Sequence, residues 1–274
     1  MGRLVLSLLL CLMPAATGFA QSAAPPVVRL RGPLVQGGLI VGRTHPGAAV
    51  EVDGRTLRVG EDGTFVFGIG RDAAPRARLR ITLADGRVRT RVLEIRRRRF
   101  RRQRIDNLPP AMVTPPEELA PRILAEQTRL AALWGVDTPE PLFATGFAWP
   151  LRGIITGVYG SQRILNGQPR QPHWGLDIAA PEGTPVRAPA DGVVLLAESG
   201  FYYTGGTILL DHGFGLVSGF LHLSALDVSE GQHVKRGEPI GKVGSTGRAT
   251  GPHLDWRVRW LDVFVDPQLL LPRP

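Results

Sequence analysis

Short apolar runs separated by glycine-containing turns recur along most of the chain, and this pattern limits its fold most strongly. Between Val27 and Ile95 the runs are three to five residues long, which suits strands better than helices. Asp-Gly dipeptides separate several of them and favour tight hairpins with positive φ. The dipeptides stand at positions 53–54, 62–63 and 85–86. This part of the sequence therefore predicts a small antiparallel β-sandwich.

A second set of strand-length apolar runs fills the C-terminal part of the chain, which is also rich in Gly, Val, Leu and Ile. The clearest runs are 192–196, 207–210, 216–223 and 253–258. Their length and composition predict an antiparallel β-sheet domain. The expected fold class is thus mainly β.

A proline-flanked segment separates the two β-rich parts. Leu119, Ile123, Leu130 and Leu133 follow near-helical spacing, which predicts a helix over about 117–134. Prolines precede the segment at 109, 110, 115 and 116 and follow it at 139 and 141. The expected organisation is a β-sandwich over 25–105, a linker over 106–146 and a second domain over 147–274.

The first twenty residues have the pattern of a secretory signal peptide. Arg3 precedes an apolar run from Leu4 to Met13, and small residues follow as far as Ala20. No later stretch reaches the ~20 apolar residues that a membrane span requires. Cys11 lies inside the apolar run, and a lipoprotein signal is the weaker alternative because leucines precede the cysteine. We expect an exported protein, periplasmic by default, with release from the cell as the alternative.

The net charge of +9 favours an anionic partner. Export argues against nucleic acid and leaves membrane surfaces or acidic envelope polymers. The basic run Arg96–Arg104 is the candidate contact for anionic polymer, although a solvated strand or linker explains the run at least as well.

Five of the six histidines lie between positions 173 and 253. His173 and Asp177 stand four residues apart, which allows two metal ligands but is weak by itself. His253 and Asp255 are stronger, because residues i and i+2 of a strand face the same side. With His222 at the end of another strand, these side chains supply what metal-assisted hydrolysis requires: ligands and groups that move protons.

Four motifs in this order resemble the lysostaphin/LytM-like zinc endopeptidases, over roughly 147–267. The matching motifs are His-x-Gly-x-Asp at 173–177, Gly-Thr-Pro-Val-x-Ala-Pro-x-Asp-Gly at 183–192, a Gly-x-x-Val-x-x-Gly-x-x-Ile-Gly stretch at 231–241 and Ser-Thr-Gly-x-x-Thr-Gly-Pro-His at 245–253. The resemblance implies a β-sheet peptidase domain with a groove, one zinc ion per chain, and hydrolysis of amide bonds in the peptide part of peptidoglycan.

The resemblance also implies roles for individual residues. His173 and Asp177 correspond to zinc ligands, and His222 and His253 to the two non-ligand histidines that orient and deprotonate water and stabilise the oxyanion. The family pattern ends in His-x-His, whereas this chain has Asp255 at the third ligand position. A carboxylate there adds negative charge, which weakens Lewis acidity and makes Mn or Fe more competitive.

Asp255 leaves a second function open: a metal-free, peptidase-like regulator that binds and activates other cell-wall hydrolases or a division partner. A biotinyl- or lipoyl-like carrier is excluded, because Lys235 and Lys242 lack the hairpin setting that such a carrier needs.

The remaining residues of interest carry weaker expectations. His45, His212 and His233 read as structural or surface histidines in turns or loops. Trp174 and Trp256 fit either core packing or a dry wall beside the ligands. Tyr202 and Tyr203 receive no role. We expect the N-terminal β-domain to bind wall, bind a partner or cover the groove.

Overall fold

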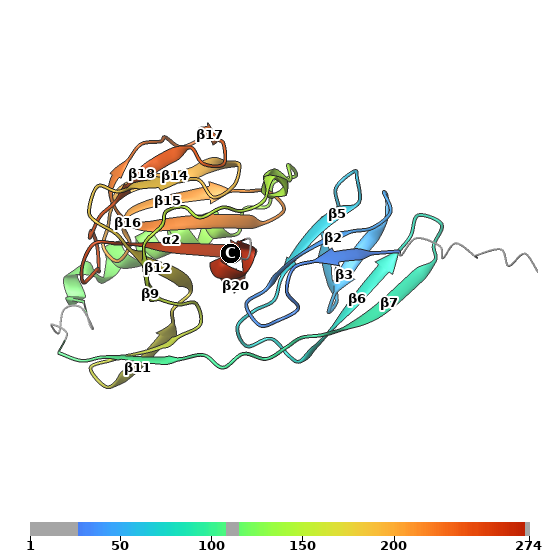
Figure 1. The fold of residues 1–274 in the computed structure, drawn as a ribbon, viewed down its shortest axis with the longest axis horizontal. Helices are drawn as coiled ribbons and strands as arrows, with labels where there is room; N and C mark the ends of the chain where they lie inside the picture. The colour runs from blue at the N-terminus through green and yellow to red at the C-terminus, as the bar shows by residue number, and fades with distance from the viewer. Residues whose placement is uncertain (1–26, 108–114, 272–274) are drawn as a thin grey trace, which may run out of the picture.

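The computed structural model describes residues 27–107 and 115–271. The expected signal peptide, Cys11 and the prolines at 109 and 110 therefore lie outside the described residues. Within the described ranges, no helix is long and apolar enough to cross a membrane. The mainly β fold with antiparallel sheets and a linker helix is confirmed (Figure 1).

Two antiparallel sheets form the N-terminal part. The first has the order β1-β2-β5 and the second β4-β3-β6-β7. Their strands are β1 (Arg29–Arg31), β2 (Leu39–Arg43), β3 (Ala49–Val52), β4 (Arg55–Leu57), β5 (Thr64–Gly68), β6 (Arg76–Thr82) and β7 (Val88–Glu94). Asp53 and Gly54 have φ values of 50° and 82°, which is the backbone that an Asp-Gly hairpin requires. Buried apolar side chains such as Ile40, Phe65 and Leu79 fill this part of the core.

A ten-stranded sheet forms most of the C-terminal part, with the main order β17-β14-β15-β16-β19-β12-β9. Its strands are β9 (Ile154–Gly157), β12 (Gly175–Ala179), β13 (Pro185–Arg187), β14 (Gly192–Phe201), β15 (Gly205–Asp211), β16 (Leu216–Leu226), β17 (His233–Val234), β18 (Pro239–Val243), β19 (His253–Trp260) and β20 (Val263–Val265). Short 3-10 helices are η1 (Glu117–Leu119), η2 (Leu142–Thr145) and η3 (Pro267–Leu270). β15, β16 and β19 are almost wholly buried, so the centre of this sheet is the core of the C-terminal part.

The helix α2 (Ala120–Trp134) follows η1 and covers part of this sheet. Its last residue, Trp134, is buried in a cluster with Leu196, Phe201, Leu209 and Val217. Gly219 allows this contact, because a Cβ there would lie 2.6 Å from the Trp134 ring. The C-terminal end of the helix is therefore held by apolar packing against β14, β15 and β16.

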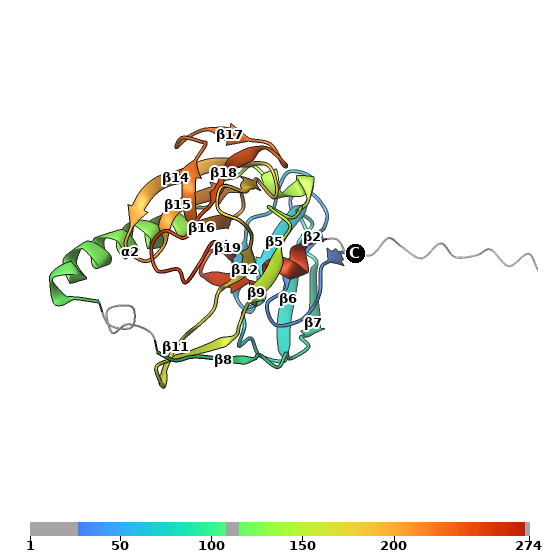
Figure 2. The ribbon, with the colours of Figure 1, turned by 60° about the vertical axis from the view of Figure 1, so that its left-hand side comes forward.

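The basic run is part of the folded structure and joins the two β-rich parts. Arg98 Nη1 lies 2.7 Å from the carboxylate of Asp266, whose side chain is only 2% exposed. The guanidinium groups of Arg71 and Arg98 lie 4.7 and 5.1 Å from the centre of the Phe100 ring. Two residues later, β8 (Arg102–Ile105) pairs in parallel with β10 (Gln162–Leu165), which forms a hairpin with β11 (Gln168–Pro172) (Figure 2). Arg98 is thus committed to an internal ion pair.

Replacing Arg98 with alanine should destabilise the protein, because Asp266 would remain buried without its cation. Burial already raises the pKa of Asp266, and the Arg98 charge opposes that rise. We expect a loss of about 2 kcal/mol, since removal of one partner of a buried pair is costly and Arg98 is partly exposed. Denaturant unfolding of Arg98→Ala beside the exposed neighbour Arg97→Ala checks this. Equal losses of unfolding free energy in the two variants would contradict a stabilising role of the Arg98–Asp266 ion pair.

Candidate metal centre

The sheet register places two carboxylates directly opposite each other. Asp177 on β12 is the Cα partner of Asp255 on β19, and the next pair on the same face is Gly175 with Arg257. Gly157 and Gly175 provide the space: a Cβ at Gly157 would collide with the Asp177 carboxylate, and one at Gly175 with that of Asp255. Both aspartates are buried, at 7% and 2% exposure.

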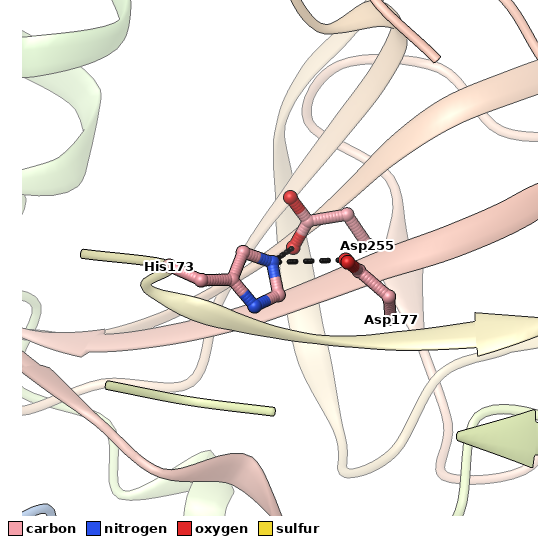
Figure 3. A group of neighbouring side chains, drawn as sticks. All are labelled: His173, Asp177 and Asp255. Carbon is pink, nitrogen blue, oxygen red and sulfur yellow. Dashed lines mark ion pairs between the residues drawn. The ribbon is translucent and has the colours of Figure 1, made fainter. Parts of the chain in front are cut away.

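His173 reaches the two aspartates from the segment before β12. Its backbone is fixed on both sides, because Gly160 N–H donates to the His173 carbonyl and His173 N–H donates to Ser161. The ring Nδ1 faces the carbonyl of Val158 at 3.4 Å, which leaves Nε2 directed at the carboxylates. Nε2 lies 2.9 Å from Asp177 Oδ1 and 3.6 Å from Asp255 Oδ1 (Figure 3).

These three side chains have the geometry of a metal site. One nitrogen and two carboxylate oxygens lie within 4.8 Å of one another, and all three residues are buried. Zinc bonds of ~2.1 Å in a tetrahedron place ligand atoms ~3.4 Å apart, close to the two His173–aspartate distances. The Nε2 atom of His173 is buried and makes no hydrogen bond within the described structure. The donor set therefore fits a zinc ion, which His173, Asp177 and Asp255 would hold.

The charges at the cluster are strongly coupled. Burial disfavours a protonated His173, but Asp255 and Asp177 outweigh burial and raise the pKa of His173. Burial likewise disfavours an ionised Asp255, but Arg257 and His173 outweigh it and hold the pKa of Asp255 well below its usual range. The carboxylate of Asp255 therefore stays ionised inside the protein.

His222 and His253 lie beside each other next to this cluster, with ring centroids 4.8 Å apart. Each Nδ1 lies 2.8 Å from a backbone carbonyl, of Thr246 and Gly251 respectively. Carbonyls only accept, so each ring donates from Nδ1 and keeps Nε2 as an acceptor when neutral. Burial lowers the pKa of His222, which favours the neutral ring. His222 also has φ 68°, an uncommon backbone for a non-glycine residue that is often found at functional sites.

Arg257 belongs to the cluster although it lies outside every motif considered above. Its Nη2 lies 2.6 Å from Asp255 Oδ2, and its Nε lies 3.1 and 3.2 Å from Oδ2 and Oδ1. The signal for it in the sequence is the i, i+2 spacing of opposite charges on one strand, which puts both on the same face.

The other residues singled out from the sequence lie elsewhere or pack. His45 and His233 are exposed. Trp256 is fully buried in the core, and Trp174 stacks on Phe264 at 5.6 Å. Tyr202 and Tyr203 contact each other edge to face, and Arg248 lies over Tyr203. His212 is fully buried; its Nδ1 donates to the Asp191 carbonyl and its Nε2 lies 2.8 Å from Ser218 Oγ.

The β-sheet domain with its buried His-Asp-Asp cluster and adjacent histidine pair defines a peptidase-like metal centre. Residues 171–267 match peptidase family M23. A crystal structure from Pseudomonas aeruginosa, whose protein is assigned to the same family, is 32% identical, with a TM-score of 0.65. The match covers 86% of this chain and 93% of that one. The chain therefore belongs to peptidase family M23.

Two curated relatives each match about half of this chain. The cell division protein DipM of Caulobacter vibrioides is 39% identical over 145 residues, which are 50% of this chain and 23% of DipM. The DD-carboxypeptidase/endopeptidase Mpg of Neisseria meningitidis is 47% identical over 137 residues, 49% of this chain and 29% of Mpg. The chain thus matches less than a third of the length of either relative.

Filling the space beside the carboxylates should disrupt the metal centre. In Gly157→Ala the new Cβ would collide with the Asp177 carboxylate, which must move away from His173. We expect a loss of about 1–3 kcal/mol of stability, as for other overpacked sites, together with weaker zinc binding. Thermal unfolding and calorimetric zinc titration measure both. Gly200→Ala is the control, because a Cβ there meets no atom within 4 Å; equal behaviour of the two variants would refute the prediction.

The buried His212 should make the fold acid-sensitive. Burial lowers its pKa to about 4, whereas the unfolded chain takes up the proton near ~6.5. Between these values the unfolded state binds more protons, so the free energy of unfolding should fall as the pH falls, by roughly 3 kcal/mol in total. Denaturant unfolding at several pH values should show a flatter profile in His212→Gln than in the wild type or in His233→Gln. An unchanged profile in His212→Gln would count against it.

Proposed function

We propose that the protein is an exported, periplasmic, zinc-dependent endopeptidase that hydrolyses amide bonds in the peptide stems or cross-links of peptidoglycan. The observation that carries this proposal is the convergence of His173, Asp177 and Asp255 beside the paired rings of His222 and His253. Membership of peptidase family M23 and the similarity to a DD-carboxypeptidase/endopeptidase support this reaction class. The signal-like first twenty residues and the net charge of +9 suit export to an anionic cell envelope.

The chemistry divides between the metal and the two histidines. A zinc ion held by His173, Asp177 and Asp255 would polarise the amide carbonyl and lower the pKa of the attacking water. His222 and His253 present Nε2 because their Nδ1 atoms donate to Thr246 and Gly251. A neutral Nε2 accepts the proton of the water, and the resulting imidazolium returns it to the leaving amine. The second ring would stabilise the developing oxyanion through an Nε2–H, which requires one proton taken up from solvent beforehand.

One observation favours a second candidate, a metal-free regulator of cell-wall hydrolases. Asp255 replaces the third histidine of the family pattern and already has a cationic partner, Arg257, at 2.6 Å. The similarity of half of the chain to a protein named for cell division supports this role. In that case the face of the sheet with His222 and His253 would bind a partner protein in place of a substrate.

Metal content and peptidoglycan digestion separate the two candidates. We expect about one zinc per chain by mass spectrometry in the wild type and loss of zinc in Asp255→Ala, because the removed carboxylate is a ligand. Purified peptidoglycan should release new amino termini with the wild type. His222→Ala should cut about 10²–10⁴ times more slowly, the usual effect of losing a proton-transfer group.

The control for digestion is His233→Ala, which removes an exposed histidine on β17. Circular dichroism of every variant verifies the fold. A zinc-loaded wild type that leaves all peptidoglycan preparations intact would exclude the peptidase. If the wild type holds no metal after zinc is supplied, and His222→Ala still activates a partner hydrolase, the regulator takes its place.

A further inference from the structure

Two facing carboxylates in a buried part of a sheet require a counter-charge. Asp177 and Asp255 are direct cross-strand partners, an arrangement in which like charges repel. Asp255 is only 2% exposed, so water screens its charge poorly. Besides His173, the cation that touches Asp255 in the described structure is Arg257, through Nη2 and Nε.

Arg257 contacts both oxygens of Asp255: its Nη2 lies 2.6 Å from Oδ2, and its Nε lies 3.1 Å from Oδ2 and 3.2 Å from Oδ1. Oδ1 is also the oxygen nearest to His173 Nε2, at 3.6 Å. Gly175 permits this arrangement, since a Cβ at that position would lie 2.8 Å from Arg257 Cγ and would overlap Asp255 Oδ1. Arg257 therefore binds Asp255 most closely through Oδ2, while Oδ1 also borders the point where the three candidate ligands meet.

The net charge of the cluster accounts for an aspartate at position 255. In the family pattern the ligands are two histidines and one aspartate, which carry one net negative charge when the histidines are neutral. His173, Asp177, Asp255 and Arg257 together also carry one, because the guanidinium cancels the second carboxylate. The site thus presents a divalent cation with the same net charge as the family pattern.

We propose that Arg257 is a positioning residue that makes Asp255 electrostatically equivalent to a neutral histidine ligand and holds the centre together when no metal is bound. The part that concerns ligation rests on the proposed function, whereas the part that concerns stability without metal does not.

Substitutions at Arg257 test both parts in the full-length mature protein. Arg257→Gln should lower the melting temperature by about 5 °C or more in the presence of a chelator, because the facing carboxylates lose their counter-charge. Added zinc should restore much of that loss, so the fold becomes dependent on metal. Arg257→Lys should retain most of the chelator-resistant stability. Arg259→Gln, on the same strand with its guanidinium 5.1 Å from the Phe264 ring, is the matched control. Zinc should raise its melting temperature by no more than it raises that of the wild type.

Zinc affinity, measured by calorimetric titration, tests the equivalence to histidine. Arg257→Gln should bind zinc at least about tenfold more tightly, because a nearby positive charge is removed. Asp255→His should bind more weakly, because the guanidinium then lacks its carboxylate. The double variant Asp255→His/Arg257→Gln should return to within a few-fold of the wild type. The two single changes are thus expected to oppose each other.

The possible failures are distinguishable. If Arg257→Gln matches the wild type in chelator and in zinc affinity, the proposal is overturned. Effects of the same sign from the two single changes, or a double variant whose zinc affinity stays far from that of the wild type, would overturn the equivalence to histidine. If neither the wild type nor any variant binds zinc, the proposed metallopeptidase fails, and the equivalence to histidine fails with it. The melting temperatures in chelator would still decide whether Arg257 is the counter-charge.

Discussion

The candidate metal centre depends on the register of one strand pair, in which β12 and β19 place Asp177 opposite Asp255. Facing carboxylates inside a protein are costly, and the structure offsets that cost from two sides. His173 approaches from the segment before β12, and Arg257 lies one pair further along the same face. The glycines at 157 and 175 leave room for both carboxylates. The same arrangement brings the three atoms that could bind a metal within 4.8 Å of one another.

The N-terminal part is connected to this centre through the segment 158–161. Arg71 donates to the carbonyl of Gly160, and the Gly160 N–H donates to the carbonyl of His173. Phe100 packs so closely on Gly160 that a Cβ there would overlap the ring. The backbone of a proposed ligand is therefore held from both β-rich parts, and the basic run contributes to packing as well as to surface charge.

Local patterns in the sequence predicted the elements well. Short apolar runs and Asp-Gly hairpins depend on residues next to each other, so strands such as β2, β5 and β6 could be located from the sequence. The parallel pairing of β8 with β10 could not, because it joins segments about sixty residues apart. The ion pair between Arg98 and Asp266 also joins segments far apart in the chain. In addition, a run of arginines resembles a solvated segment, so the sequence did not reveal this pair.

The sequence by itself determined the chemical inventory of the site: His173, Asp177, His222, His253 and the departure at Asp255, all carried by motifs. Tertiary structure decided which charged groups surround Asp255. The register of β12 and β19 brings Asp177 against Asp255, and the rotamer of Arg257 sends its cation to Asp255. Electrostatic balance depends on distances of a few ångströms between strands far apart in the chain, and residue spacing alone does not encode those distances.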